Sequence, residues 1–355
     1  MPVVRIIAVS EILDQHKLFC KLTYEGSVDA VVVEATFSAI GMGVGLLGHF
    51  LREYVITCPL IDELVPFHVS LIPSPMAPVS FALPVTVPNR PQVKEEFAAC
   101  VSVTYWTHNP FKIIEWMELL RTFGVSKVTI YNNSLIAEAS LVFRHYDRQG
   151  FVDFRQSHNF VNEPGEYNIH LHMSPVINDC MYRNMHAYKK IVVTDLDEII
   201  VPRNHSNYHD MLLAIDKALP EYHPARSYIF SNAYFFTDLP PSNASQNETS
   251  NLWTIKYRVR MPTSPQGYAI KSMIDPQTCI NMHNHYCWGL TSLYEKAGQQ
   301  VEVPELLGLN QHYKRCHWEK CVESWKQAIS DDSMLRFREV LTDRVNAKLK
   351  EIGIV

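Results

Sequence analysis

The chain has 355 residues, of which 47% are hydrophobic and 19% are charged. This is enough to form a sizeable core in one large domain with a smaller one beside it, or in two domains. The formal net charge of −5 gives no support to a nucleic-acid partner bound through a basic surface.

Cysteines and glycosylation motifs indicate the compartment. The chain has eight cysteines and lacks the Cys-x-x-Cys spacing of a zinc site. Four Asn-x-Ser/Thr motifs begin at Asn132, Asn204, Asn243 and Asn247. Together they favour the secretory lumen. Because the first residues lack the basic-then-apolar order of a signal peptide, we expect any membrane anchor or signal to lie upstream of this chain or to have been lost from it.

The first 95 residues predict a small β-rich module, followed by a linker near 88–95. The apolar stretch from Ala35 to Leu51 contains four glycines, so we expect a core segment there and not a membrane span. A proline-rich stretch follows from Pro73 to Pro91. The expected strands are Val3–Val9, Leu18–Tyr24, Asp29–Val33, His68–Ile72 and Val79–Val87.

Residues 96–355 predict a second domain, in which strands and helices alternate at first. Asn109-Pro110 opens one helix, and Gly124 and Gly150 end two of them. Such alternation is typical of an α/β fold with a parallel, Rossmann-like sheet and right-handed crossovers. The expected strands are Val101–Tyr105, Lys127–Tyr131, Phe151–Phe154 and Ile191–Thr194; the expected helices are 109–123, Ile136–Arg148 and Ser174–Tyr188.

Beyond residue 203 the pattern is less regular. It predicts a helix over Tyr208–Ala218 and strands near Ser227–Phe236 and Asn251–Arg260. A terminal amphipathic helix is expected over Leu335–Ile352.

The fourth expected strand runs directly into Asp195-Leu-Asp-Glu. Alternate residues of an extended strand point to the same side, so Asp195 and Asp197 should project together. Two carboxylates on one side suit Mn²⁺ or Mg²⁺, and such an ion suits a diphosphate. Ligands of parallel sheets bind beyond the carboxyl ends of the strands, where this motif lies.

Two enzyme classes use an acidic motif of this kind. In phosphatases of the haloacid dehalogenase type, Asp195 would be the nucleophile, but their motif follows the first strand of the core. Here about ninety residues of α/β pattern precede it. In nucleotide-sugar transferases of the GT-A fold, an Asp-x-Asp motif after the fourth strand binds the metal. The position of the motif favours the second class.

Several sequence blocks together resemble glycosyltransferase family 92, also called the DUF23 family. The resemblance is closest over residues 90–345 and looser before that. The blocks are Cys100-Val-Ser-Val-Thr-Tyr, Glu115-Trp116, Gly124-Val125, Asn178-Asp179-Cys180 with Arg183, Val193 to Pro202, Lys271-Ser272, His283 with His285, and His312-Tyr313 with Cys316. The His-Tyr block commonly continues with Arg in the family, whereas this chain has Lys314 and then Arg315.

This resemblance implies a metal-dependent, inverting galactosyltransferase of the β1,4 type. Such an enzyme uses UDP-galactose as the donor, a glycan as the acceptor, and Mn²⁺ or Mg²⁺. The relatives are type II membrane proteins of the Golgi, which again places the anchor outside this chain. The alternative to catalysis is a degenerate relative that binds glycans without transferring sugar.

The resemblance also suggests site residues. Asp195, Asp197 and His312 are the expected metal ligands, although His312 could equally be a hydrogen-bonded core histidine. Lys271 is expected to offset phosphate charge. Asp179 and Arg183 lie four residues apart on one helix face, and they either contact the donor or form an ion pair within the helix. Tyr105 and Asn132 end strands where uracil and ribose contacts are expected; each could equally serve packing.

An inverting transfer needs a general base that deprotonates the acceptor hydroxyl. The candidates are Glu198, Asp238, Asp275 and Glu295, with Glu295 or Asp238 preferred because Glu198 lies beside the expected metal. The spacing of the last four cysteines suggests local disulfides Cys279–Cys287 and Cys316–Cys321. Eight cysteines nevertheless allow 105 full pairings.

Overall fold

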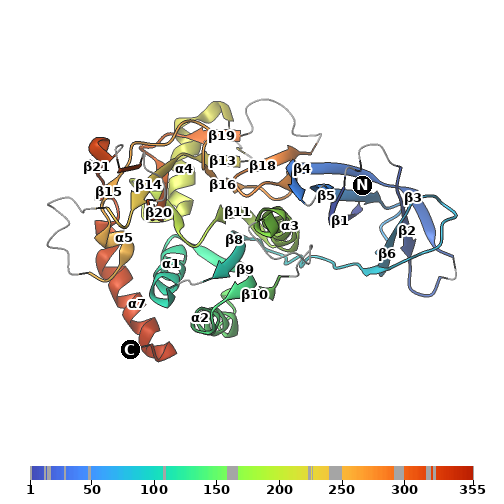
Figure 1. The fold of residues 1–355 in the computed structure, drawn as a ribbon, viewed down its shortest axis with the longest axis horizontal. Helices are drawn as coiled ribbons and strands as arrows, with labels where there is room; N and C mark the ends of the chain where they lie inside the picture. The colour runs from blue at the N-terminus through green and yellow to red at the C-terminus, as the bar shows by residue number, and fades with distance from the viewer. Residues whose placement is uncertain are drawn as a thin grey trace.

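The protein is a mixed α/β structure with a group of β-sheets at its N-terminal end (Figure 1). The computed structural model describes residues 2–11, 13, 17–27, 29–46, 49–106, 109–157, 167–222, 225, 227–239, 250–291, 300–316, 321–322 and 325–354. Within these ranges, no helix is long and apolar enough to cross a membrane.

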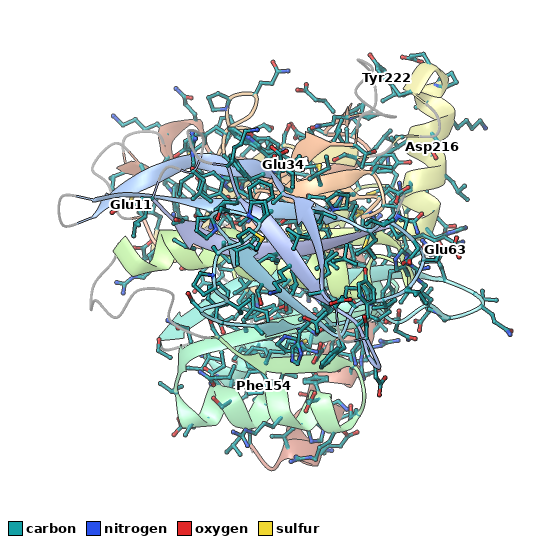
Figure 2. All side chains as sticks on the ribbon, turned by 90° about the vertical axis from the view of Figure 1, so that its right-hand side faces the viewer. Glu11, Glu34, Glu63, Phe154, Asp216 and Tyr222 are labelled. Carbon is teal, nitrogen blue, oxygen red and sulfur yellow. A yellow bond between two sulfur atoms is a disulfide. The ribbon has the colours of Figure 1, made fainter. Side chains whose placement is uncertain are left out.

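Two antiparallel sheets form the N-terminal part, and they face the viewer in Figure 2. The disulfide Cys20–Cys58 joins the two sheets through a core that includes Leu22, Tyr54 and Ile56. The first sheet has the order β1 (Val3–Ser10), β5 (His49–Pro59), β4 (Thr36–Leu46); the second has the order β3 (Val31–Glu34), β2 (Phe19–Thr23), β6 (His68–Ile72), β7 (Leu83–Pro84).

One expected strand of this part needs correction. The apolar stretch from Ala35 to Leu51, which was not expected as a strand pair, forms most of β4 and the start of β5, and these pair antiparallel. The long strand expected over Val79–Val87 is reduced to the two residues of β7. Pro84 lies within β7 and Pro88 follows it, and both lack a backbone N–H donor, which limits the pairing of this strand. The division of the chain at residue 95 stays a prediction.

A seven-stranded sheet forms the centre of the remaining chain. Its first four strands are mutually parallel, as predicted, and carry the helical crossovers. The last three extend the sheet with antiparallel and parallel pairs. The order is β10 (Val152–Gln156), β9 (Val125–Leu135), β8 (Glu95–Trp106), β11 (Tyr188–Thr194), β16 (Lys271–Ile274), β13 (Ser227–Phe230), β19 (Gln300–Val303).

Helices pack on both faces of this sheet. α1 (Pro110–Thr122), α2 (Ala137–Arg148) and α7 (Arg338–Ile352) share one core with it, and α3 (Tyr167–Asn184) builds another on the opposite face (Figure 1). Asn109 caps α1 by accepting a 2.9 Å hydrogen bond from the N–H of Phe111. Gly124, Gly150 and Gly353 follow the three helices of the first face at positive φ.

The predicted bounds of α3 were wrong at both ends. The helix begins at Tyr167 and includes Pro175, which the prediction had placed in the first turn. It ends at Asn184, and Tyr188 already belongs to β11. A proline within a helix removes one backbone hydrogen bond but need not end the helix when tertiary packing supports it. Buried Val176, together with its neighbours in the core around α3, provides that packing.

A smaller sheet lies beside the large one, with the order β12 (Glu198–Pro202), β20 (Gly308–Lys314), β14 (Asn232–Phe236). The single strand expected over Ser227–Phe236 is therefore two strands, β13 and β14, in different sheets. The strand expected over Asn251–Arg260 is wrong as well. It contains the short helix α5 (Trp253–Lys256), followed by β15 (Val259–Arg260), which pairs with β21 (Ile329–Ser330).

A hairpin of β17 (Cys279–Met282) and β18 (Cys287–Leu290) connects the two parts of the chain. Asn281 of the hairpin donates hydrogen bonds of 2.8 Å to the hydroxyl of Ser38 and the carbonyl of Ala39 in β4. The remaining helix α4 (Tyr208–Ala218) has the predicted bounds. All eight cysteines are paired, as Cys20–Cys58, Cys100–Cys180, Cys279–Cys287 and Cys316–Cys321.

Candidate functional site

The acidic motif occupies the turn that joins the two sheets. β11 ends at Thr194, and β12 begins at Glu198. Hydrogen bonds from other elements hold the turn through its backbone carbonyls. Trp116 of α1 donates from its indole N–H to the carbonyl of Glu198 at 2.8 Å. The N–H of Tyr313 likewise donates to the carbonyl of Asp197. The motif thus lies at the carboxyl end of a parallel strand, as predicted.

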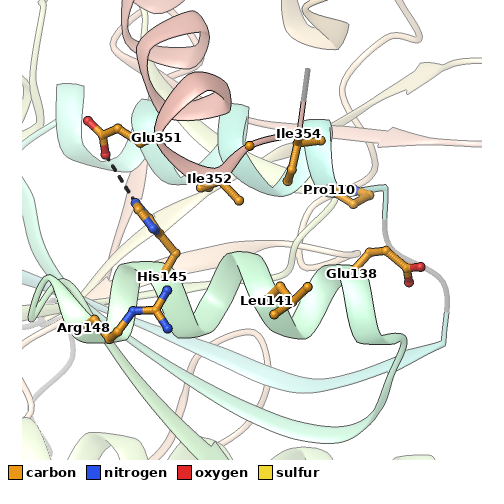
Figure 3. Close-up of a pocket in the computed structure, with 9 residues that line it drawn as sticks. Pro110, Glu138, Leu141, His145, Arg148, Glu351, Ile352 and Ile354 are labelled. Atoms are coloured by element: carbon orange, nitrogen blue, oxygen red, sulfur yellow. Dashed lines mark hydrogen bonds and ion pairs between the residues drawn. The ribbon is translucent and has the colours of Figure 1, made fainter.

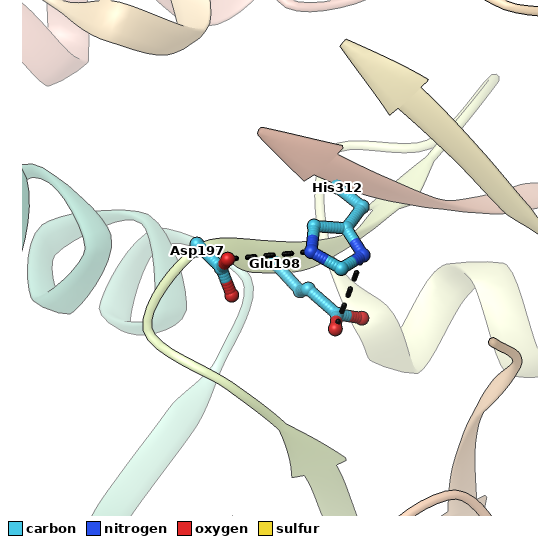
Figure 4. A group of neighbouring side chains, drawn as sticks. All are labelled: Asp197, Glu198 and His312. Atoms are coloured by element: carbon cyan, nitrogen blue, oxygen red, sulfur yellow. Dashed lines mark hydrogen bonds and ion pairs between the residues drawn. The ribbon is translucent and has the colours of Figure 1, made fainter. Parts of the chain in front are cut away.

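Three side chains converge at this turn (Figure 4). Glu198 and His312 are cross-strand partners in β12 and β20. The Nδ1 atom of His312 lies 3.3 Å from Oε1 of Glu198, and its Nε2 atom lies 3.3 Å from Oδ2 of Asp197. One potential ligand atom from each residue lies within 4.8 Å of the other two. The group therefore offers two carboxylates and an imidazole to a divalent cation.

Asp195 has different interaction partners from Asp197. Its Oδ2 accepts a 2.6 Å hydrogen bond from the ammonium of Lys271, and its Oδ1 accepts one from Ser102. Lys271 is fully buried and also lies 3.7 Å from Oε1 of Glu198. Lys271 thus contacts two carboxylates of the acidic motif. Its expected role in offsetting phosphate charge stays a prediction.

These charges shift one another's ionisation. Burial alone would raise the pKa of Asp195, but the ammonium of Lys271 holds it at about 2. Burial lowers the pKa of His312, yet the charges of Glu198 and Asp197 outweigh this and raise it. Burial raises the pKa of Glu198 by more than His312 and Lys271 lower it. For Asp197, the hydrogen bond and charge of His312 outweigh burial and lower the pKa.

The sequence did not indicate three polar residues of the site, which are Asn310, Asn232 and Ser102. Asn310 is fully buried and donates at 2.6 Å to Oε2 of Glu198 and at 3.2 Å to Asn232. The third is Ser102, which contacts Asp195. Asn310 precedes His312 by two residues in the same strand, so strand alternation could have indicated that both face the same side.

His283 and His285 lie at the turn of the β17–β18 hairpin. The Nδ1 atom of His285 hydrogen-bonds to the carbonyl of Ile270 at 2.8 Å, next to Lys271 in the chain. The ammonium of Lys271 donates to the carbonyl of Asn284 at 3.2 Å. Burial is the main cause that lowers the pKa of both histidines, to about 4 for His285. The hairpin turn therefore borders the carboxylate cluster with uncharged imidazoles at neutral pH.

The residues expected around the nucleotide are engaged within the protein. Arg183 donates to Asp179 at 2.6 Å, and the hydroxyl of Tyr131 donates to the same carboxylate at 2.5 Å. This is the ion-pair arrangement, although a donor contact stays a prediction. Asn132 donates to Gln156 and accepts from the N–H of Leu135. Tyr105 belongs to β8, and its side chain lies outside the described residues.

The candidate bases are dispersed. Glu295 lies outside the described residues. Asp238 follows β14 and accepts from the N–H of Cys316 at 2.9 Å, near the ends of β14 and β20. Asp275 closes a turn by accepting from the N–H of Gln277. Glu198 belongs to the three-residue group itself.

A pocket of about 280 Å³ lies elsewhere, between α2 and the end of α7 (Figure 3). Leu141, Ile352 and Ile354 give it an apolar surface, and His145 pairs with Glu351 at its edge at 3.3 Å. None of the predicted site residues lines it.

Residues 95–351 match the family model described as Glycosyltransferase family 92. Among solved structures, the chain is similar to the apo structure of the bifunctional glycosyltransferase WbbM, with 9% sequence identity and a TM-score of 0.25. That alignment covers 43% of this chain and 26% of WbbM, so the chain spans about a quarter of that structure's length. The comparison with curated proteins found no match.

Proposed function

The chain belongs to glycosyltransferase family 92, and from this premise we propose that it is a metal-dependent, inverting galactosyltransferase. The donor is UDP-galactose, and the product is a β-linked galactose on a glycan hydroxyl. We also propose that residues 96–355 adopt the GT-A fold. The observation that carries the proposal is the group of Asp197, Glu198 and His312 at the carboxyl end of β11, where parallel α/β sheets bind ligands. Family membership leaves no support for the phosphatase alternative.

We assign the metal contacts to Asp197, Glu198 and His312. The donor set fits Mn²⁺ or Mg²⁺, because it combines two hard carboxylates with one imidazole. The buried Nδ1 atom of His312 makes no hydrogen bond within the described part of the chain, although it lies 3.3 Å from Glu198. A bound ion would neutralise the negative charge that develops on the departing diphosphate.

Asp195 takes a supporting part in this proposal, although the sequence pattern had suggested a direct ligand. Its two oxygens are used by Lys271 and Ser102. Lys271 thereby balances the negative charge of the turn before any cation binds. Asn310 fixes the second oxygen of Glu198, so that the first one remains directed at His312.

The transfer itself requires a base for the acceptor hydroxyl. The base removes the hydroxyl proton as the oxygen bonds to the anomeric carbon, and the bond to the diphosphate breaks with its electron pair on UDP. Asp238 and Glu295 remain the proposed candidates. Asp238 is held at the end of β14, the strand that neighbours His312 in β20. The hydrogen bond from Cys316 goes to its Oδ1 atom, and its Oδ2 atom lies 3.8 Å from Nε of Arg315.

We further propose that the protein acts in the Golgi lumen as a type II membrane protein. The four disulfides support an oxidising compartment. The four glycosylation motifs agree with it.

The deciding experiment measures release of UDP from UDP-galactose with Mn²⁺ and with a chelator. We expect turnover only with the metal, and its loss in Asp197→Asn. Mn²⁺ affinity, measured by electron paramagnetic resonance, should fall by at least about tenfold in the same variant. Glu63→Gln is the matched control, because it removes an exposed carboxylate from the N-terminal part (Figure 2). Metal-independent turnover, or unchanged Mn²⁺ affinity in Asp197→Asn, would reject the proposal.

A further inference from the structure

The hairpin turn beside the carboxylate cluster carries a group of aromatic rings. Tyr286 and Trp288 lie two residues apart, their ring centroids are separated by 6.0 Å, and their planes differ by 26°. His283 contacts both, at 5.7 Å and 6.1 Å. Trp288 is 44% exposed although it is a large aromatic residue. The two larger rings therefore present an extended apolar surface to solvent.

This surface also carries unused polar groups. Neither the indole N–H of Trp288 nor the hydroxyl of Tyr286 has a hydrogen-bond partner among the residues that the structure describes. A single exposed apolar side chain is common and needs no explanation. Two nearly parallel rings with free polar groups differ from that case, since a ring face with a polar edge is suited to amphipathic ligands.

The aromatic group is next to the proposed catalytic turn. Lys271, which pairs with Asp195, donates to the carbonyl of Asn284 in the same hairpin turn. The ring of His285 lies 5.3 Å from that of His283. The hairpin turn that contains Asn284 thus contacts Lys271 on one side and leads to Trp288 on the other.

The hairpin is held rigidly on its other side. The disulfide Cys279–Cys287 closes it, and Asn281 fixes it to β4 through Ser38 and Ala39. Gly289 leaves room for Asn281, because a Cβ at that position would lie 2.2 Å from its Oδ1 atom. A platform on such a hairpin loses little conformational freedom when a ligand binds.

We propose that Trp288 and Tyr286 form the platform on which a pyranose ring of the acceptor glycan stacks. This proposal rests on the function proposed above and names the acceptor subsite of the same site. Aromatic faces bind the C–H face of a sugar, and the free indole N–H and phenol then reach its hydroxyls. A galacto-configured pyranose fits best, because its axial O4 leaves the C3, C4 and C5 hydrogens together on one face.

The test uses methyl β-D-galactopyranoside as the probe and saturation-transfer NMR as the readout, with no donor present. We expect saturation of the H3, H4 and H5 signals by the wild-type protein. Trp288→Ala should raise the Kd of the probe by about tenfold, as for an aromatic anchor, and Trp288→Phe should restore most of the binding. Tyr222→Ala, at another exposed aromatic residue (Figure 2), should leave the Kd unchanged.

The outcomes separate this inference from the proposed function. An unchanged Kd in Trp288→Ala, or no binding of the probe by the wild-type protein, overturns the platform even if UDP-galactose is turned over. Probe binding that depends on Trp288 upholds the platform even if no UDP is released. In an active enzyme, Trp288→Ala should raise the acceptor KM while Mn²⁺ affinity stays at the wild-type value.

Discussion

The ammonium of Lys271 lies 2.6 Å from Oδ2 of Asp195, 76 positions earlier in the chain, and the lysine side chain is fully buried. Glu198 is also buried and lies 3.7 Å from the same ammonium. One buried cation therefore balances two carboxylates at the turn between β11 and β12. Removing it leaves both negative charges in a medium of low dielectric.

We expect Lys271→Met to destabilise the fold by about 3–5 kcal/mol, because buried charges without a partner cost that much. Urea denaturation gives the difference in unfolding free energy. Lys189→Met is the control, since the Lys189–Glu96 pair is exposed and contributes at most about 1 kcal/mol. Adding Asp195→Asn to Lys271→Met should recover part of the loss, whereas strictly additive losses would show that the two residues do not interact.

A second contact links the hairpin to the N-terminal sheets. We expect Asn281→Ala to cost about 2 kcal/mol, because two partly buried hydrogen bonds to β4 are lost. Hydrogen exchange should accelerate in β17, β18 and β4 but remain unchanged in α2. Gln266→Ala removes an exposed hydrogen bond to Glu302 and serves as the control. Unchanged exchange in β4 would mean that the contact does not hold the hairpin.

Local signals in the sequence predicted many elements correctly. The Asn109 cap, the glycines after α1 and α2, and the bounds of α4 depend on neighbouring residues, so they can be read from the chain. The end of the buried strand β11 also placed the acidic motif correctly. Where tertiary packing decides the conformation, as around Pro175 in α3, the same local reasoning failed.

The composition of the site depended on contacts that a single sequence does not contain. Both aspartates were expected to bind one ion because they are two residues apart. The structure gives them different partners: Lys271 engages Asp195, and the cross-strand pairing of Glu198 with His312 brings His312 to Asp197. These pairings span 76 and 114 positions, respectively, and follow from sheet order and register.

Glu53 predicts a pH dependence of stability. It is buried in β5, and burial raises its pKa from 4.5 to about 7, against the charge of Arg52. Because the pKa of Glu53 is higher in the folded state, its contribution to the unfolding free energy is full below pH 4.5. That contribution is lost as the pH rises through about 7. The loss is up to about 3 kcal/mol by pH 8.

Glu53→Gln should remove this loss. The unfolding free energies of variant and wild type should be similar near pH 4.5, and the variant should become the more stable protein by pH 8. Urea denaturation across this range measures the difference. Glu63→Gln controls for the loss of an exposed carboxylate. A difference between Glu53→Gln and the wild type that does not change with pH would contradict the prediction.

Glu115 of α1 is a buried acceptor that holds the start of α5. Its carboxylate accepts from the backbone N–H groups of Trp253 and Thr254, at 2.8 and 2.9 Å, and from the hydroxyl of Thr254 at 2.5 Å. Burial nevertheless raises its pKa to about 7, so the variants should be compared at pH 8, where the carboxylate is ionised. Glu115→Ala leaves three buried donors without an acceptor and should cost about 3 kcal/mol or more.

The graded series at this site tests the cause of that cost. Thr254→Val removes only the hydroxyl donor and should cost about 1 kcal/mol. The cost of Glu115→Gln should lie between those of Glu115→Ala and Thr254→Val, because the glutamine N–H₂ group replaces one acceptor oxygen and faces a backbone donor. If Glu115→Ala costs no more than Thr254→Val, the backbone donors of α5 find water or other acceptors. The carboxylate would then not be what holds α5 against α1.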